Sequence, residues 1–370
     1  WHRKPKKLQE DEFTSLAEIT SRDQDDFNVT LDELLRVRVP DTRAHNEVKQ
    51  YIIGTMESLG WSVETDKFQS YTPHGRKRFT NIIATHNPDA CKRLVFACHY
   101  DSKWTPSQEF VGAIDSAVPC AMLLNLVKSL DNKLQKQKTR DDITLQLIFF
   151  DGEEAFEDWT ETDSLYGSRH LASKWNKLKF PRTENDKKCV GNYVSELDRI
   201  ELFVLLDLLG SPNPAFYSYF QETNSLHQRL RRIETKLNDL KLLESHPPQH
   251  RTAYFRDVQK FSYIEDDHVP FVKKDVPVLH IIPNPFPYVW HTDNDNKRNL
   301  HYGTINNLMK IFKIFMVQYL HLTPIDVDCV EDVNGAVEVK VAVDVEHVGD
   351  VDEDASFCQK SCKVLIFVNN

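Results

Sequence analysis

Short apolar runs alternate with amphipathic segments along most of the chain. Five runs are apolar without strict alternation, a pattern typical of strands buried on both faces of a sheet: residues 81–85, 93–98, 143–150, 202–206 and 278–282. Between them, apolar residues recur at helical spacing over 117–134, 165–178 and 226–240. This alternation predicts an α/β fold, a three-layer sandwich in which helices flank a mixed, largely parallel central sheet.

The pattern changes at both ends of the chain. Residues 1–29 are charged and lack periodicity, which indicates a mobile N-terminal arm. A helix is predicted over 42–59, a strand over 61–68, and a last helix over 305–322, just before Pro324. Beyond it, valines alternate with acidic residues, and we expect a β-prone or disordered acidic tail. The predicted organisation is an arm (1–29), one large domain (30–322) and a tail of unknown role (323–370).

Composition and charge exclude several classes of protein. The 370 residues are 40% hydrophobic and 28% charged, as is ordinary for a soluble globular protein. The formal net charge of -10, without a basic stripe, argues against a nucleic-acid partner. No run of about 18 apolar residues occurs, so no membrane span is expected. Because the chain begins with Trp1 rather than Met, we expect that a targeting segment was removed or not included.

Two features favour the secretory route. The chain has seven cysteines, too many to ignore and too few for a disulfide scaffold. The tripeptide Asn28-Val29-Thr30 is a glycosylation acceptor pattern. We therefore expect a secreted glycoprotein.

Polar residues that suit a metal follow the predicted strands. In an open α/β sheet, ligands bind beyond the carboxyl ends of the strands. The polar residues there, together with one before the helix at 117–134, combine histidine nitrogens and carboxylate oxygens: His99, Asp115, Glu154, Asp207 and His291. Zinc accepts both atom types and keeps three protein ligands where a position stays open for chemistry. A zinc site is predicted, and a metal-free acidic cleft is the alternative.

Several long motifs resemble one family. They cover residues 98–103, 112–120, 149–156, 163–170, 205–210, 266–271 and 285–291. In these motifs, and in their order over about 28–322, the chain resembles glutaminyl-peptide cyclotransferases (glutaminyl cyclases), which are related to zinc aminopeptidases. The resemblance implies an aminopeptidase-like fold for the domain at 30–322.

The resemblance also implies roles for individual residues. One zinc ion per chain would be held by Asp115, Glu154 and His291. Glu153 would be the catalytic proton shuttle, and the catalytic carboxylates Asp207 and Asp266 would form hydrogen bonds near it.

The substrate pocket and one disulfide are implied in the same way. The residues matching the pocket are Trp159, Ile264, Glu265, Phe286 and Trp290. Glu265 departs from the family, because a glutamine is expected there. The resemblance pairs Cys98 with Cys120 in a disulfide. It assigns no role to Cys91, Cys189 or Cys329, and within the tail Cys358 and Cys362 either pair or remain free.

The activity implied by the resemblance is that of an acyltransferase. N-terminal glutamine of a peptide or protein, and more slowly glutamate, would be cyclised to pyroglutamate with release of ammonia or water. The partners would be such peptides, and the protein would be a monomer in the secretory pathway, with the Golgi lumen as one location. One alternative is a zinc aminopeptidase, with His99 and Asp207 as ligands of a second metal. The other is an inactive binding domain on the same scaffold.

Overall fold

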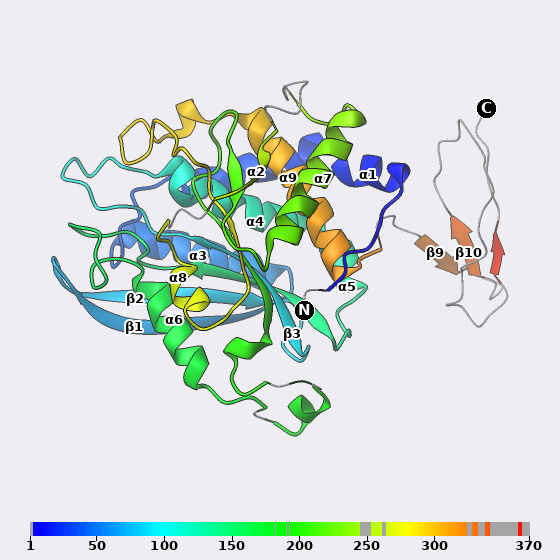
Figure 1. Cartoon of the computed structure of the whole chain (residues 1–370), viewed down its shortest axis with the longest axis horizontal. Coiled ribbons are helices and arrows are strands. Elements are labelled where there is room, and N and C mark those ends of the chain that lie inside the picture. Colours follow the sequence, from blue (N-terminus) through cyan, green and yellow to red (C-terminus); the bar gives the residue numbers. More distant parts are fainter. Residues whose placement is uncertain are drawn as a thin grey trace. The chain divides into compact units, whose positions relative to one another are not determined.

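A six-stranded sheet runs through the first of two units into which the chain divides, Trp1–Leu322 and Thr323–Asn370 (Figure 1). The computed structural model describes residues 3–181, 183–189, 191, 193–244, 253–260, 264–323, 328–331, 337–340 and 362–364. In spatial order the strands are β1 (Ser62–Thr72), β2 (Gly75–Thr85), β4 (Ile143–Phe150), β3 (Lys92–His99), β5 (Ile200–Leu206) and β8 (Val278–Ile281).

The sheet is mixed and mostly parallel. Strands β4, β3, β5 and β8 run parallel to their neighbours, whereas the β1–β2 hairpin joins the edge in antiparallel pairing. All residues of β4 are buried, which explains the absence of alternation in its sequence. The predicted fold class is therefore confirmed.

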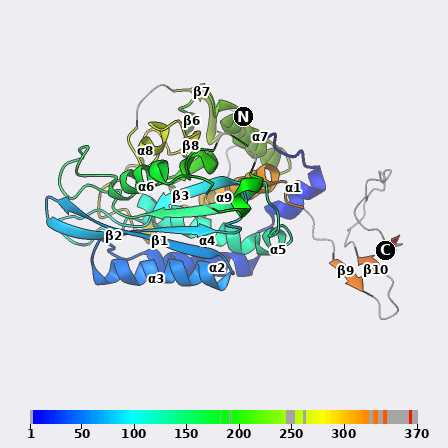
Figure 2. The ribbon, with the colours of Figure 1, turned by 90° about the horizontal axis from the view of Figure 1, so that it is seen from below.

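Helices cover both faces of this sheet. On one face lie α2 (Ser21–Leu34), α3 (Arg43–Ser58), α4 (Val118–Ser129) and α9 (Tyr302–Leu320), in one apolar cluster with Leu94 and Phe96 of β3. The alternate residues Val95 and Ala97 contribute to a second cluster with α6 (Tyr166–Lys177) and α8 (Val269–Val272). Figure 2 shows α3 and α6 on opposite sides of the sheet. The two apolar clusters make this a three-layer sandwich.

The other elements of the first unit are short or peripheral. They are α1 (Glu10–Ala17), the π-type turn η1 (Ala113–Ala117), α5 (Asp131–Gln135), the 3-10 turns η2 (Asn185–Lys188), η3 (Leu197–Arg199) and η4 (Lys297–Asn299), β6 (Phe216–Ser218), α7 (Asn224–Asp239) and β7 (Phe255–Gln259). The helix predicted over 117–134 is divided at Leu130 into α4 and α5. None of the helices that the structure describes has the length and apolar character that a membrane crossing requires.

The prediction of a mobile arm over 1–29 is wrong for residues 10–29. Both α1 and the first half of α2 lie there, and Phe13, Leu16 and Phe27 are buried in the core. The Thr20 side chain caps α2 in a reciprocal pair with Asp23. The charged residues that concealed the pattern occupy the solvent-facing sides of two short amphipathic helices, each with only one narrow apolar stripe.

The second unit contains a small sheet. Its strands are β9 (Asp328–Glu331), β10 (Val337–Lys340) and β11 (Cys362–Val364), in the order β11-β10-β9. The alternating valine segment thus forms part of a strand, β10, in agreement with its period-two pattern. Cys358 lies outside the described residues, so its predicted pairing or freedom stays untested.

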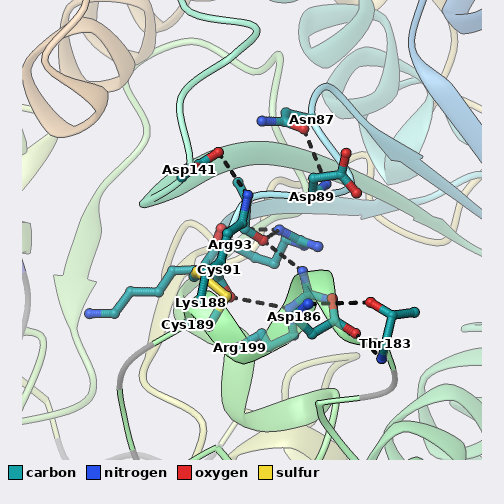
Figure 3. The surroundings of a disulfide bond; sticks show 12 residues. Asn87, Asp89, Cys91, Arg93, Asp141, Thr183, Asp186, Lys188, Cys189 and Arg199 are labelled. Atoms are coloured by element: carbon teal, nitrogen blue, oxygen red, sulfur yellow. Dashed lines mark hydrogen bonds and ion pairs between the residues drawn. A yellow bond between two sulfur atoms is a disulfide. The ribbon is translucent and has the colours of Figure 1, made fainter.

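Two disulfides link segments of the first unit. Cys98–Cys120 joins the end of β3 to α4, as the resemblance implied. Cys91–Cys189, with a sequence separation of 98, joins the residue before β3 to the residue after η2 (Figure 3). The Cys91 carbonyl also accepts a hydrogen bond from Nε of Arg199, at 3.2 Å. Neither cysteine has a role predicted from the sequence, because only the fold brings such distant positions together.

Loss of the Cys91–Cys189 bond is expected to lower stability. The bond closes a loop of 98 residues, and removing a crosslink of that kind costs about 2–4 kcal/mol, chiefly through the unfolded chain. Cys91→Ser and Cys91→Ser/Cys189→Ser should therefore show the same decrease in free energy of unfolding, measured by urea denaturation. Stability equal to that of the unsubstituted protein would show that this bond contributes nothing.

Candidate functional site

The carboxyl ends of β3, β4 and β5 bring the polar residues together. His99 is the last residue of β3, Glu153 and Glu154 follow β4, and Asp207 follows β5. The buried carboxylate of Asp101 accepts the backbone N–H groups of Glu153 at 3.2 Å and of Glu154 at 3.3 Å. The loop after β3 thus fixes the loop after β4, at the sheet edge where ligands bind in such folds.

Three of the predicted ligands converge on one point. Candidate ligand atoms of Asp115, Glu154 and His291 lie within 4.8 Å of one another. His291 Nε2 is 3.4 Å from Asp115 Oδ2 and 3.4 Å from Glu154 Oε1. Lys103 Nζ lies 3.5 Å from Glu154 Oε2.

The hydrogen bonding of these carboxylates fits a bound cation. Asp115 Oδ2 and both Glu154 carboxylate oxygens are buried without a hydrogen-bond partner among the described residues. Their nearest positive groups, the His291 ring and the Lys103 ammonium, lie at 3.4–3.5 Å, and a bound cation would compensate the burial of these oxygens more fully. The His291 side chain is 25% exposed, so the group opens toward solvent. Two carboxylates and one imidazole with an open side are suitable for a zinc ion that keeps one position free.

A buried arginine holds the Asp115 loop in place. Arg38 donates from Nε to the Tyr100 carbonyl at 2.8 Å, and from Nη2 to the carbonyls of Gly112 at 3.0 Å and Asp115 at 3.3 Å. Gly112 has a φ of 52°, and a Cβ there would clash with the Asp115 carbonyl. Arg38 is not predictable from the sequence, since nothing in the local pattern signals carbonyl partners more than 60 residues away.

A second group of candidate ligands is largely satisfied by its own hydrogen bonds. His99 Nε2 is 3.0 Å from Asp115 Oδ1 and 3.5 Å from Asp207 Oδ1, and the Ser116 hydroxyl donates to Asp207. Burial lowers the pKa of His99, but the carboxylates of Asp101, Asp115 and Asp207 outweigh it and raise the pKa well above its usual value. Against the lowering effect of burial, the pKa of His291 is also raised, to about 9, by Asp115 and Glu154, so protonation alone does not distinguish the two groups. The difference is geometric: His99 Nε2 is buried and lies 3.0 Å from Asp115 Oδ1 in a hydrogen bond, whereas the His291 side chain is 25% exposed. The contrast favours the Asp115 group as the metal position.

A third group lies behind the site. His280 Nε2 is 2.6 Å from Asp266 Oδ2, and the His268 ring lies 4.1 Å from the His280 ring. Burial lowers the pKa of His268 well below its usual value, and the neighbouring His280 adds to the effect. This arrangement is typical of buried, hydrogen-bonded side chains that orient a carboxylate.

The carboxyl group of Glu153 has the electrostatic surroundings of a proton carrier. Burial raises its pKa well above the usual value, the charges of Glu154 and Asp266 add to this effect, and His99 opposes it. Burial and Asp266 likewise raise the pKa of Asp207 to about 6. A carboxyl group with a raised pKa can hold and release a proton, as general acid–base chemistry requires.

A cavity of about 560 Å³ connects this chemistry to an aromatic pocket. The side chains predicted to form the pocket all line it: Trp159, Ile264, Glu265, Phe286 and Trp290. Glu153, Asp207 and the three candidate metal ligands line the same cavity, whereas Asp266 is buried outside its lining. Trp159 Nε1 donates to Glu265 Oε2 at 2.7 Å, and the Trp290 ring stacks on the His291 ring at 4.0 Å.

Comparison with known proteins places this site in a family. Residues 81–316 match the model of Peptidase family M28. The chain is 44% identical, over 323 residues, to a glutaminyl-peptide cyclotransferase from Drosophila melanogaster, with 85% of this chain and 86% of the relative covered. It resembles the crystal structure of Macrostomum lignano glutaminyl cyclase with a TM-score of 0.77 at 36% identity, covering 86% of this chain and 96% of that chain.

The fold is also found in an aminopeptidase. A leucine aminopeptidase precursor from Bacteroides thetaiotaomicron has a TM-score of 0.60 at 20% identity, over 82% of this chain and 98% of that chain, which shows a common fold alone. The resemblance identified from the motifs is confirmed by the close sequence relatives. This chain belongs to the glutaminyl-peptide cyclotransferases of peptidase family M28.

Proposed function

We propose that this protein cyclises N-terminal glutamine of peptides and proteins to pyroglutamate, and N-terminal glutamate more slowly. The observation that carries the proposal is the single cavity in which three metal-binding side chains, the buried Glu153 and an aromatic pocket meet. One zinc ion per chain, held by Asp115, Glu154 and His291, is part of the proposal. When bound there, zinc supplies a Lewis acid that polarises the γ-carbonyl of the substrate.

The pocket walls supply the proximity that the reaction needs. The α-amine of glutamine attacks its own γ-carbonyl, a C–N bond forms, and the bond to the amide nitrogen breaks as ammonia leaves. Trp159, Phe286 and Trp290 enclose the side chain and hold it folded back on its amine. Such orientation contributes up to about 7–11 kcal/mol in well-positioned intramolecular reactions.

Glu153 carries the proton between the two nitrogens. It takes a proton from the attacking amine and delivers it to the departing ammonia, so it acts first as base and then as acid. The charge of Asp266 raises its proton affinity, and Asp207 shares hydrogen bonds near it. In the cyclisation of glutamate, the protonated γ-carboxyl group loses its hydroxyl, which leaves as water with the proton taken from the amine.

Ammonia release from a glutamine-initiated peptide tests this function directly. We expect stoichiometric ammonia and a mass loss of one ammonia from the peptide, and no reaction after N-acetylation, because the nucleophile is then blocked. Release of a free N-terminal amino acid would instead establish an aminopeptidase. A zinc-loaded protein that binds the peptide without converting it would support the inactive binding domain.

Metal stoichiometry separates the cyclase from the aminopeptidase alternative. His99 and Asp207 are the residues that would hold a second metal, and their ligand atoms cluster with one of Asp115. After dialysis against micromolar zinc, one zinc per chain is expected, because His99 is already paired with carboxylates. Two zinc ions per chain would favour the aminopeptidase.

We also propose a cellular location for the protein. The two disulfides are consistent with an oxidising environment, and we propose a monomer that acts in the secretory pathway or outside the cell. The acceptor Asn28 lies within α2, next to an exposed Val29 and a buried Thr30. Mass spectrometry of protein from a secreting host would show whether Asn28 carries a glycan.

Glu265 is expected to affect the preference of the enzyme for the residue that follows the N-terminal glutamine. Its carboxylate lines the cavity with Glu157 and Asp158, so the mouth is acidic and should favour a basic residue after the glutamine. Glu265→Gln keeps an acceptor for Trp159 but removes the charge. We expect the kcat/KM ratio of Gln-Lys to Gln-Glu peptides to fall by about 2- to 5-fold, the size of an exposed charge interaction.

The control for this prediction is Glu57→Gln, which removes one exposed charge at a residue that does not line the cavity. It should leave the ratio unchanged. Added salt should reduce the ratio for the unsubstituted enzyme, since exposed charges are screened. A ratio insensitive to both Glu265→Gln and salt would contradict the assignment.

A further inference from the structure

A second cavity, of about 600 Å³, lies against α3 and the β1–β2 hairpin. Its lining comes from residues 41–49 around the start of α3, 67–69 of β1 and 78–80 of β2, and it shares no residue with the lining of the aromatic cavity. Figure 2 shows α3 running beside these two strands. The cavity is within the size range of small-ligand sites.

The lining of this cavity is cationic in a protein that is acidic as a whole. It includes Arg43, Lys49, Lys67 and Arg78 against one carboxylate, Asp41, whereas the whole chain has a formal net charge of -10. Because the basic side chains repel one another, such a cluster is unfavourable without counter-charges. Glu47, outside the lining, balances part of this positive charge, and a bound anion would balance the rest.

Among the described residues, two of these four cations have ion-pair partners. Arg78 Nε is 2.8 Å from Asp41 Oδ1, and Arg43 Nε is 2.8 Å from Oε1 of Glu47. For Lys49 and Lys67, the structure shows no ion pair or hydrogen bond of the ammonium group within the described part of the chain.

The surroundings of Lys49 disfavour its positive charge. Lys49 is half-buried. Its burial lowers its pKa, and the charges of Lys67 and Arg78 lower it further, against the opposing carboxylates of Asp151 and Asp41. Two unpaired ammonium groups, on α3 and β1, therefore face one cavity together with the guanidinium of Arg78.

The uncharged lining limits the kind of ligand. Phe68 and Phe79 stack at 5.3 Å and add an apolar surface, and Asn46 and Gln69 add neutral polar groups. An extended polyanion would reach beyond the cavity and be repelled by the net negative charge of the protein. A compact anion would contact only the cationic lining of the cavity. The size of the cavity and the spacing of its basic side chains on three elements suit a small ring or sugar that carries more than one oxyanion group.

We propose that this cavity is a binding site for a compact ligand that carries several sulfate or phosphate groups, held by Lys49, Lys67 and Arg78. Sulfate and phosphate esters share the tetrahedral oxyanion that ammonium and guanidinium groups bind. The proposal is independent of the proposed function, because it rests on a different cavity and its readout is binding.

Isothermal titration calorimetry on the full chain tests the site, with sucrose octasulfate and inositol hexakisphosphate as probes. We expect saturable binding with one site per chain and a dissociation constant that rises with salt. Lys49→Gln/Lys67→Gln should weaken the binding at least about tenfold, since two charge-assisted hydrogen bonds to the ligand are lost. The probe that binds more tightly identifies sulfate or phosphate esters as the preferred chemistry.

The matched control is Lys177→Gln/Lys273→Gln, which removes the same charge from exposed lysines outside the cavity. It should leave the dissociation constant within about twofold, because distant exposed charges are screened. Lys67 is exposed, so Lys67→Gln alone tests the loss of one charge without altering the half-buried Lys49. Absence of binding at millimolar probe, or equal weakening by the control pair, would overturn the proposal.

Discussion

Glu153→Gln is expected to lower turnover by about 100- to 10,000-fold, the range of general acid–base catalysis, with a smaller effect on substrate affinity. Glutamine has nearly the same shape and can still accept or donate hydrogen bonds, but it cannot take a proton from the amine. Glu153 is not among the three grouped metal ligands, so zinc should remain bound. Steady-state kinetics and metal content on the same preparation measure both effects.

The adjacent Glu154→Gln provides the matched comparison. It removes a ligand carboxylate whose two oxygens are buried without other hydrogen-bond partners among the described residues, so zinc affinity should decrease. Competition with a chelator measures that decrease. If Glu153→Gln holds zinc and turns over normally, Asp207 or Asp266 must carry the proton. If Glu153→Gln loses zinc, the roles of the two glutamates are reversed.

The strands were predictable where burial is uniform. The bounds predicted for residues 143–150 are those of β4, since all of its residues are buried and polar or turn residues flank it. For β2 the prediction covered only residues 81–85, because the strand continues to Gly75 in an exposed hairpin that lacks an apolar run. A sheet edge that faces solvent gives a weaker sequence signal than a sheet centre.

The two N-terminal helices show a different limit. In α1, Phe13, Leu16 and Ala17 are the buried residues among many acids, and α2 buries Phe27, Leu31 and others in the same way. Helices this narrow on their apolar side depend on tertiary packing for their stability. The periodicity is present in the sequence, but the high charge of the segment obscured it.

The positions of the candidate site residues were predictable from strand ends and motifs. The long-range contacts that hold these residues in place were not. The positions of His99, Glu154 and Asp207 after buried strands follow from the strand pattern, and the structure places them at one edge of the sheet. The Arg38 contacts and the Cys91–Cys189 bond join residues 62 to 98 positions apart. Such pairs depend on the completed fold, which local spacing does not describe.

Arg38→Met is expected to lower both the stability of the protein and its zinc affinity. The guanidinium is fully buried and donates to the carbonyls of Tyr100, Gly112 and Asp115, which lose this donor in the variant. Each buried carbonyl that is left without a hydrogen-bond donor costs about 1–3 kcal/mol. Because the Asp115 loop is then less fixed, zinc should bind about 10- to 100-fold more weakly, as for other residues that orient metal ligands.

Arg199→Met separates positioning of Asp115 from a general loss of stability. Arg199 is also fully buried, but its partners are Glu196 and the carbonyls near Cys91, at the amino end of the sheet strands. It should lower the free energy of unfolding, measured by urea denaturation, without changing the zinc dissociation constant measured by chelator competition. Arg38 acts as a positioning residue only if its substitution weakens zinc binding and that of Arg199 does not. Equal weakening in both variants would assign the effect to stability alone.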